Sequence, residues 1–239
     1  MKKLFFAVCL TFALPALESC IYVDSNDGIA PRRTVSRTFD FRNFTKLDMG
    51  NAFQVHVTEG SAYEVSATGE QSDLDDLLIF VQDGELVVRY NSKWNAGRKR
   101  MDLDIVMPSL EKVDFSGAVN SDVIGFNNLN KIEFQLSGES KCDFEGSAKN
   151  VIFDINGASQ LDLFGESKYL DGELSGASQI NAFNLSAEES DLDLSGASIA
   201  KVWITKNLDV DASGASSVRY KGNPGIKKQL SGGSTLRQE

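Results

Sequence analysis

Ser175-Gly176-Ala177-Ser178 is one of seven copies of a short phrase that recurs between residues 116 and 234. The copies are Ser116-Gly117-Ala118-Val119, Ser137-Gly138-Glu139-Ser140, Asn156-Gly157-Ala158-Ser159, Ser175-Gly176-Ala177-Ser178, Ser195-Gly196-Ala197-Ser198, Ser213-Gly214-Ala215-Ser216 and Ser231-Gly232-Gly233-Ser234. Their central glycines are 21, 19, 19, 20, 18 and 18 residues apart. Recurrence at a nearly fixed interval of this length is the sequence signature of a solenoid.

Apolar and polar residues alternate on both sides of each central glycine. The residue three positions before the glycine is always polar, and the residue two positions before it is always apolar: Phe115, Leu136, Ile155, Leu174, Leu194, Ala212 and Leu230. The alternation resumes four and six positions after the glycine, where Cys142 and Phe144 stand in the second copy. A period of two predicts a strand with one buried face on each side of the turn.

A coil of about 19 residues cannot bury its own apolar face, but coils stacked about 4.8 Å apart bury it against one another. The sequence therefore predicts an all-β protein built as a parallel β-helix. Glycine and serine suit the sharp corner of such a coil, because glycine readily adopts a positive φ. By parity the fourth residue of each phrase points inward, and in six of the seven copies this residue is a serine. We interpret this hydroxyl ladder as structural, because a nucleophilic serine needs an adjacent base and the single histidine, His56, lies outside the repeats.

Residues 1–19 are typical of a secretory signal peptide. Met1-Lys2-Lys3 precedes an apolar run from Leu4 to Leu17 that is too short to span a bilayer. The run ends in Leu17-Glu18-Ser19-Cys20, which resembles the lipobox of bacterial lipoproteins and implies lipidation at Cys20. Residues 20–37 then read as a lipidated tether. The alternative is that Cys20 is an ordinary cysteine beside a conventional cleavage site.

The charge of the chain excludes one class of partner. The formal net charge is −10, and removal of residues 1–19 would make it −11. An acidic chain is a poor ligand for nucleic acid or for an anionic membrane surface. We expect contact with the membrane through the lipid anchor instead, in an outer membrane lipoprotein that faces either the cell surface or the periplasm.

The mature chain divides into two parts by the regularity of its pattern. Residues 38–110 are strand-like with a looser period, and residues 111–239 hold the regular repeats. Within the first part, Gln82-Asp83-Gly84-Glu85 predicts a hairpin turn. We expect residues 38–110 to form irregular β coils that cap the N-terminal end of the solenoid, since an uncovered edge invites aggregation. His56 stands between two valines, and an exposed side chain explains it better than a catalytic one.

Two charged features are candidate sites. The first is a basic and aromatic loop, a candidate glycan-binding site that a solvated hairpin loop would also explain: Lys93, Trp94, Arg98, Lys99 and Arg100. The second is a pair of outward acidic rows on successive coils: Asp154, Glu173, Asp193 and Asp211 in one row, and Asp171, Asp191 and Asp209 in the other. Calcium could bridge such carboxylates, but the rows lack the compact loop of a dedicated calcium site, and a solvated face is the favoured interpretation.

The chain resembles a family of secreted bacterial proteins, the putative auto-transporter adhesins with a head GIN domain. The resemblance runs from about Phe39 to Leu236 and rests on the lipobox, the repeats, Gly50-Asn51-Ala52-Phe53-Gln54-Val55 and Asp83-Gly84-Glu85-Leu86-Val87-Val88. It implies a right-handed β-helix related in shape to pectin lyases, no recognised catalytic set, and a role in cell adhesion.

We therefore expect a non-enzymatic cell-envelope lipoprotein whose β-helix binds a polysaccharide or a cell-surface protein, without a cofactor. Two hypotheses compete with this one. The first is a polysaccharide lyase or hydrolase, which would draw its carboxylates from the acidic rows; these acids repeat evenly, whereas a catalytic site breaks its repeat at one place. The second is a periplasmic scaffold without an external ligand.

Overall fold

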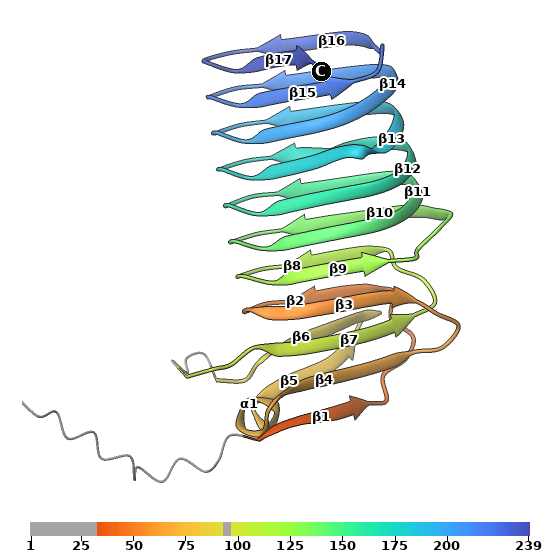
Figure 1. Ribbon diagram of the computed structural model, residues 1–239, viewed down its shortest axis with the longest axis vertical. Coiled ribbons are helices and arrows are strands. Elements are labelled where there is room, and N and C mark those ends of the chain that lie inside the picture. The colour runs from red at the N-terminus through yellow and green to blue at the C-terminus, as the bar shows by residue number, and fades with distance from the viewer. Residues whose placement is uncertain (1–32, 93–96) are drawn as a thin grey trace, which may run out of the picture. The chain divides into compact units, whose positions relative to one another are not determined.

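The computed structural model describes residues 33–92 and 97–239, which lie in one compact unit, Arg33–Glu239 (Figure 1). The predicted signal peptide, Cys20, residues 20–32 of the tether, and Lys93 and Trp94 of the basic loop lie outside the described residues. The helix α1 spans Gln71–Asp75. The strands are β1 (Thr34–Phe39), β2 (Lys46–Met49), β3 (Phe53–Glu59), β4 (Glu64–Glu70), β5 (Leu77–Gln82), β6 (Glu85–Tyr90), β7 (Met101–Met107), β8 (Lys112–Phe115), β9 (Asn120–Ile124), β10 (Leu129–Leu136), β11 (Lys141–Ile155), β12 (Gln160–Leu174), β13 (Gln179–Leu194), β14 (Ile199–Ala212), β15 (Ser217–Lys221), β16 (Gly225–Leu230) and β17 (Thr235–Gln238).

The predicted parallel β-helix is confirmed. From β8 onward each coil pairs in parallel with the next coil along the chain, so that Leu136 lies beside Ile155 and Ile155 beside Leu174. The long strands β11 to β14 each run from one corner almost to the next and bend midway, which gives the stack of flattened coils in Figure 1. The inward residues on both sides of each corner form one continuous apolar core.

The corners stack as closely as the strands do. The central glycines from Gly117 to Gly232 have φ between 66° and 83°. A Cβ atom on Gly176 would lie 2.6 Å from the carbonyl oxygen of Gly157 in the preceding coil. This contact is shorter than any real side chain tolerates, so both the backbone conformation and the space exclude residues other than glycine. The same carbonyl accepts a hydrogen bond of 2.8 Å from the backbone N–H of Ala177.

The inward serines form the predicted hydroxyl ladder. Ser178, Ser198 and Ser216 are buried, and each donates a hydrogen bond to the carbonyl oxygen of the serine three residues earlier, at 2.7 to 2.8 Å. These hydroxyls therefore tie their own corners together from inside, as the structural interpretation requires.

An eighth corner, Gly50-Asn51-Ala52, joins β2 to β3 within the segment that the sequence assigned to irregular coils. Asn51 has φ 74° and takes the place of the central glycine, and its carbonyl accepts the N–H of Ala118 at 2.6 Å. The β2–β3 coil lies between two coils that follow it in the sequence, because β2 pairs in parallel with both β6 and β8. Sequence order and spatial order thus differ at this end of the solenoid.

The N-terminal end is closed by antiparallel strands. β4 pairs antiparallel with β1 and β7, and β5 pairs antiparallel with β6 through a hairpin in which Asp83 and Gly84 have φ of 51° and 75°. This hairpin was predicted from Gln82-Asp83-Gly84-Glu85, and the irregular β cap is confirmed. At the opposite end every residue of β16 is exposed, and Lys228 pairs with the inward-facing Val210. A lysine at an inward position marks the end of the apolar core.

Candidate functional site

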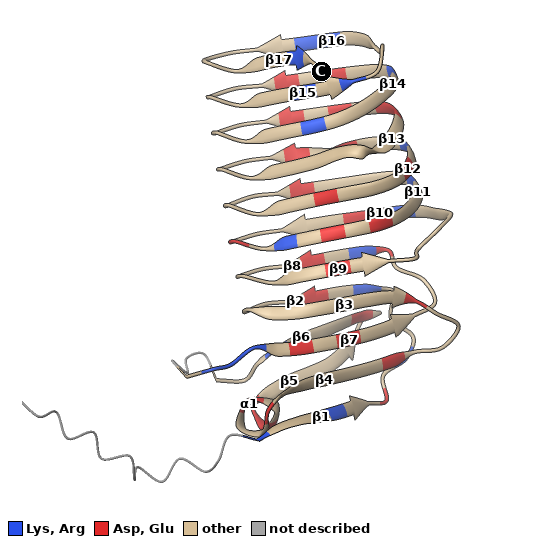
Figure 2. Cartoon of the chain, viewed as in Figure 1, with Lys and Arg blue, Asp and Glu red and all other residues tan. Residues whose placement is uncertain are grey.

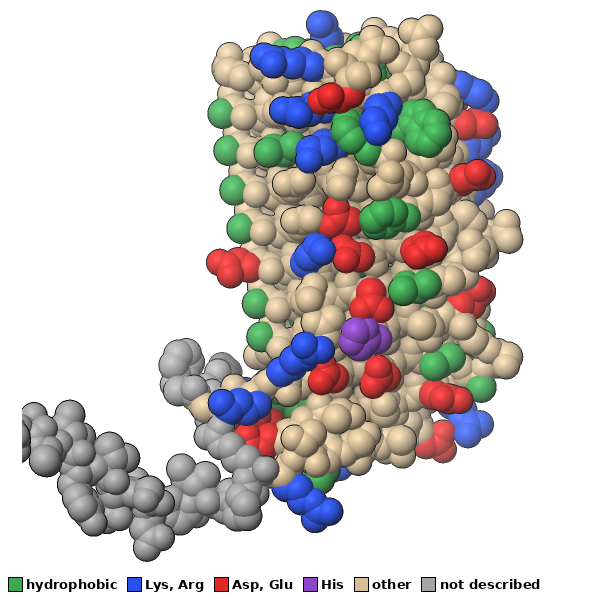
Figure 3. All heavy atoms as spheres, viewed as in Figure 1, with side chains coloured by type: hydrophobic (Ala, Val, Ile, Leu, Met, Phe, Trp, Pro, Cys, Tyr) green, Lys and Arg blue, Asp and Glu red, His purple; other side chains and the backbone are tan. Residues whose placement is uncertain are grey.

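The main candidate surface is the outward side of the strands that follow the corners, here called the post-corner face. It is built by β3, β9, the first halves of β11 to β14, β15 and β17, it is continued by β7 beside β3, and it faces the viewer in Figure 3. Among the described residues, seven large hydrophobic side chains are exposed, and four of them lie on this face: Ile124 (41%), Phe164 (39%), Ile199 (37%) and Trp203 (40%). The intervening strand β13 carries a third aromatic residue, the half-buried Phe183, at a bulge where Asn184 lies beside Phe164 and Ser186 beside Trp203.

The middle row of the post-corner face changes sign along the solenoid. Strand register places nine side chains in one line: Asp104, His56, Asp122, Asp143, Asp162, Asn181, Lys201, Arg219 and Arg237. The half nearer the N-terminal cap is acidic, and the half nearer β17 is basic. Figure 3 shows the same change, with red side chains in the middle of this face and blue ones toward β17, and Figure 2 shows the charged positions along the strands.

The charges of the acidic half are partly matched within the chain. His56 Nδ1 lies 2.6 Å from Asp122 Oδ1, and the side chain faces outward but is half-buried, with 38% of its surface exposed. Lys141 Nζ lies 3.1 Å from Asp143 and 3.8 Å from Asp162, and the hydrogen bond to Asp143 is the main cause of a raised pKa for Lys141. The hydrogen bond is to Asp143 Oδ2; Asp143 Oδ1 is buried and accepts no hydrogen bond, although it lies 3.1 Å from Lys141 Nζ.

The two predicted acidic rows lie on the opposite side of the corners, in register from coil to coil. Asp154, Glu173, Asp193 and Asp211 line a groove of about 250 Å³ beside the corner serines. In the second row Asp171 is beside Asp191 and Asp191 beside Asp209, where an ion pair with Lys227 ends the row. Burial, followed by the neighbouring Asp209 and Asp193, raises the pKa of Asp191. Burial also raises the pKa of Asp171, whose carboxylate accepts the backbone N–H of Asp191 at 2.9 Å.

Neither acidic row forms a cation cage. Within residues 33–92 and 97–239, no three His, Cys, Asp or Glu side chains come together in a group suited to a metal ion. The rows present carboxylates along a line, one per coil, whereas calcium takes 6–8 oxygen ligands around a point.

In the basic loop, Arg98 has a structural role. Its guanidinium lies 3.5 Å from the centre of the Tyr90 ring and donates to Asp76 at 2.5 Å and to the carbonyl of Ser92 at 2.9 Å. Lys99 is exposed and its backbone N–H binds Asp73, while Arg100 pairs with Asp102 at 2.6 Å. The loop therefore offers fewer free cations than its sequence indicates.

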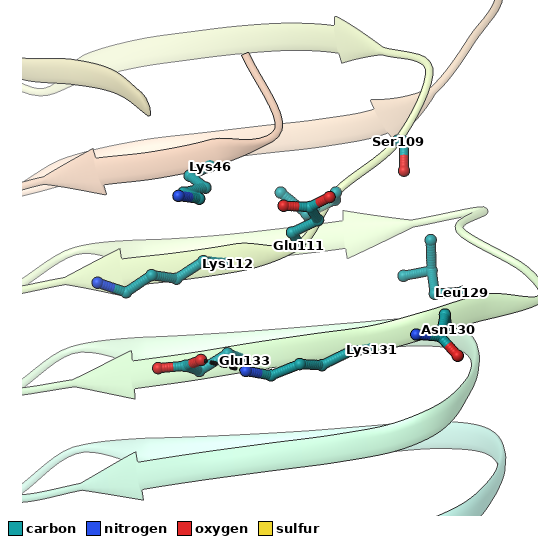
Figure 4. A pocket seen from close by; sticks show the side chains of 9 residues that line it. Lys46, Ser109, Glu111, Lys112, Leu129, Asn130, Lys131 and Glu133 are labelled. Atoms are coloured by element: carbon teal, nitrogen blue, oxygen red, sulfur yellow. Dashed lines mark hydrogen bonds and ion pairs between the residues drawn. The ribbon is translucent and has the colours of Figure 1, made fainter. Parts of the chain in front are cut away.

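A hollow of about 500 Å³ opens between β2, β8 and β10, beside the inserted β2–β3 coil (Figure 4). Lysine and glutamate side chains line it. Lys112 donates to Asp114 and Lys131 to Glu133, both at 2.8 Å, and Glu111 accepts the hydroxyl of Thr45 at 3.1 Å. Since these charged groups find partners within the chain, the hollow is a weaker candidate than the post-corner face.

Cys142 is a core residue and not a reactive thiol. It is completely buried, and burial raises its pKa to about 12. A thiol in this state supplies almost no thiolate near neutral pH, and thiolate is the nucleophilic form.

The sequence analysis did not predict the apolar part of the post-corner face, although apolar residues at one outward position of the repeat indicated it. Ile124, Phe164, Phe183 and Trp203 each stand seven positions after a corner glycine. Parity makes this position outward, so an apolar residue there is unexpected unless the face binds something.

These observations define a β-solenoid that offers extended faces, not a deep pocket, as its binding surface. The chain belongs to the family of putative auto-transporter adhesins with a head GIN domain, whose model matches residues 43–224. The family indicates a protein of the cell surface or envelope, and its adhesin names suggest a protein that is not an enzyme.

Several solved structures share this fold, among them two putative adhesins and a putative lipid binding protein. A putative adhesin from Bacteroides fragilis has a TM-score of 0.78 at 19% identity and covers 87% of this chain and 98% of its own. A putative adhesin from Parabacteroides distasonis has a TM-score of 0.68 at 18% identity, with the same coverage. A putative lipid binding protein from Parabacteroides distasonis has a TM-score of 0.67 at 16% identity and covers 86% of this chain and 96% of its own. No curated protein matches the chain. Among the described residues, no helix is long and apolar enough to cross a membrane.

Proposed function

We propose that this protein is a non-enzymatic, lipid-anchored adhesin of the cell envelope that binds its partner through the post-corner face. The observation that carries the proposal is the alignment of Ile124, Phe164 and Trp203 on one face of a rigid stack, each about 40% exposed. Exposed apolar side chains that gather on one surface are typical of interaction sites. Lipidation at Cys20 and an outer membrane location belong to the same proposal and rest on the lipobox-like sequence.

The family and the fold support adhesion over catalysis. Adhesion requires a broad, stiff surface, which in-register coils provide. The alternative is a polysaccharide lyase or hydrolase, with carboxylates from the acidic rows. An assay of the purified protein against a panel of acidic and neutral polysaccharides should release no new chain ends; reproducible release that is lost on Asp193→Asn would favour the enzyme.

Location is tested by treating intact cells with protease and following the protein by immunoblot. We expect the solenoid to be cleaved on intact cells, because an adhesin must face outward. Protection on intact cells with cleavage after lysis would overturn the surface location and favour the periplasmic scaffold.

The binding face is tested with a pair of variants. Phe164→Ser with Trp203→Ser should reduce adhesion of cells that display the protein, because it removes two exposed aromatic rings from the post-corner face. The matched control is Ile226→Ser with Leu230→Ser, which removes two equally exposed apolar side chains from β16. Equal adhesion by both pairs would exclude the post-corner face as the binding surface.

A further inference from the structure

We propose that the partner of the post-corner face is the same face of a second copy of this chain. The two solenoids lie antiparallel, related by a two-fold axis that runs along the strands at the coil of Asn181. This inference rests on the proposed function, because it names the partner of the proposed binding surface.

The charge order of the middle row is self-complementary about Asn181. Counted by coils in the register, Asp162 and Lys201 lie one coil to either side of it, Asp143 and Arg219 two coils, and Asp122 and Arg237 three coils. A two-fold axis along the strands reverses the order of the coils and leaves the position along each strand unchanged. Each acidic side chain therefore faces a basic one of the second copy.

The side chains seven positions after each corner glycine have the same symmetry when they are counted by coil, although a bulge in β13 interrupts their register at Phe183. Glu145 and Lys221 lie two coils to either side of the Asn181 coil, both exposed, and Phe164 and Trp203 lie one coil to either side. In the dimer Glu145 faces Lys221, and Phe164 faces Trp203. At the centre, Phe183 fills the gap with its ring 4.4 Å from Lys221 Nζ of its own chain.

Symmetry and charge together exclude the simplest alternatives. A two-fold axis along the solenoid would set each coil against its own equivalent and place like charges face to face, which disfavours association. Shifting the antiparallel arrangement by one coil toward β17 would place Glu145 opposite Glu239, the residue that follows β17 beside Lys221. Shifting it by one coil the other way would place Glu145 opposite Trp203 and Lys221 opposite Ile124, so the Glu145–Lys221 pair would be lost. The arrangement centred on Asn181 avoids these conflicts.

The face is large enough for a weak, specific dimer. Seven coils at about 4.8 Å and five residues at about 3.3 Å give a surface of about 34 by 17 Å. Two such faces bury roughly 1,100 Å², which is at the lower limit of specific interfaces. Because much of the pairing is electrostatic and near the surface, the association weakens as salt is added.

Cross-linking of the full chain in detergent tests the proposal. Asn181→Cys places a thiol on the two-fold axis in each copy. Packed sheets lie about 10 Å apart, beyond the reach of a disulfide, so a short bis-maleimide is the appropriate reagent. Cys142 is buried and should not react. We expect a cross-linked dimer at low salt, less at high salt, and none with Asn207→Cys, an exposed position outside the post-corner face.

Charge exchange then tests the register. In the Asn181→Cys background, Glu145→Lys and Lys221→Glu should each lower the association about tenfold, because each sets two like-charged pairs across the axis. A mixture of the two variants, or both changes in one chain, should restore cross-linking, since opposite charges again face one another. Failure of both to restore it would overturn the proposed arrangement.

The two proposals fail in different ways. If the full chain stays monomeric under all these conditions while Phe164→Ser with Trp203→Ser still abolishes adhesion, the face binds another partner, so the self-association is wrong and the proposed function stands. If the Asn181→Cys chain gives no cross-linked dimer and those two changes leave adhesion unchanged, both proposals are wrong.

Discussion

At the scale of single residues, the corner glycines carry two separate constraints, a positive φ and a backbone contact with the coil before. Asn51 shows that the two can be separated. Its φ of 74° matches that of the corner glycines, and asparagine tolerates this region better than most residues. On its other side the β2–β3 coil pairs with β6 and β7. These two strands are joined by residues 91–100 and not by a Ser-Gly-Ala-Ser phrase, so no corner of this type stacks on Asn51 from that side.

Gly176→Ala tests the backbone contact. Both the positive φ and the 2.6 Å approach to the Gly157 carbonyl oppose a side chain, so we expect a loss of about 2–5 kcal/mol in the free energy of unfolding, measured by urea denaturation. Gly84→Ala is the matched control: φ is 75°, but nothing lies within 4 Å of the added Cβ. It should cost only about 1–2 kcal/mol. Equal losses would mean that the close stacking of corners adds nothing beyond backbone strain.

At the scale of strands, parallel in-register pairing places equivalent positions of successive coils beside one another, so side chains of the same kind become neighbours. This arrangement stabilises rows of apolar side chains and destabilises rows of acidic ones, since like charges on neighbouring strands repel. Asp191, between Asp171 and Asp209, is the clearest case, and its raised pKa means that the folded protein holds a proton there more tightly than the unfolded chain does. Ionisation of Asp191 therefore lowers stability as the pH rises above the ordinary range for aspartate.

Asp191→Asn should raise the melting temperature at pH 7 by about 1–3 °C, because it removes a partly desolvated charge that the neighbouring carboxylates repel. The gain should vanish near pH 3, where the wild-type carboxyl is protonated in both states. Asp209→Asn is the control in the same row: it removes the ion pair with Lys227 and should not stabilise. A pH-independent gain at Asp191 would point to packing instead of charge.

The acidic rows also allow a test for cations. We expect neither EDTA nor millimolar calcium to change the melting temperature, because the described carboxylates stand in lines, not in a group that could surround an ion. A rise with calcium that Glu173→Gln and Asp193→Asn abolish would establish a cation site in the groove.

At the scale of the whole molecule, the solenoid converts the order of the sequence into an order along an axis. The residue five positions after the corner glycine is acidic in the first coils of the repeat and basic in the last coils. Stacking brings these residues together as the acidic half and the basic half of one face. The two ends also differ: antiparallel strands cover the N-terminal end, and the exposed β16, with Lys228 at an inward position, ends the other. A stack with covered or charged ends associates more readily through its sides than end to end.

The seven Ser-Gly-Ala-Ser phrases and the alternation around them determined the β-helix, its corners, the hydroxyl ladder and the acidic rows, because each follows from local conformation and a fixed repeat. The tertiary structure decided three further features. It placed the β2–β3 coil between two later coils, which no local pattern encodes because Asn51 replaces glycine and the pairing spans more than 60 residues. It showed that Arg98 binds Asp76 and Tyr90. It also brought Glu145, Phe164, Trp203 and Lys221 onto one face, since the register between coils, including the bulge at Phe183, exists only once the coils are stacked.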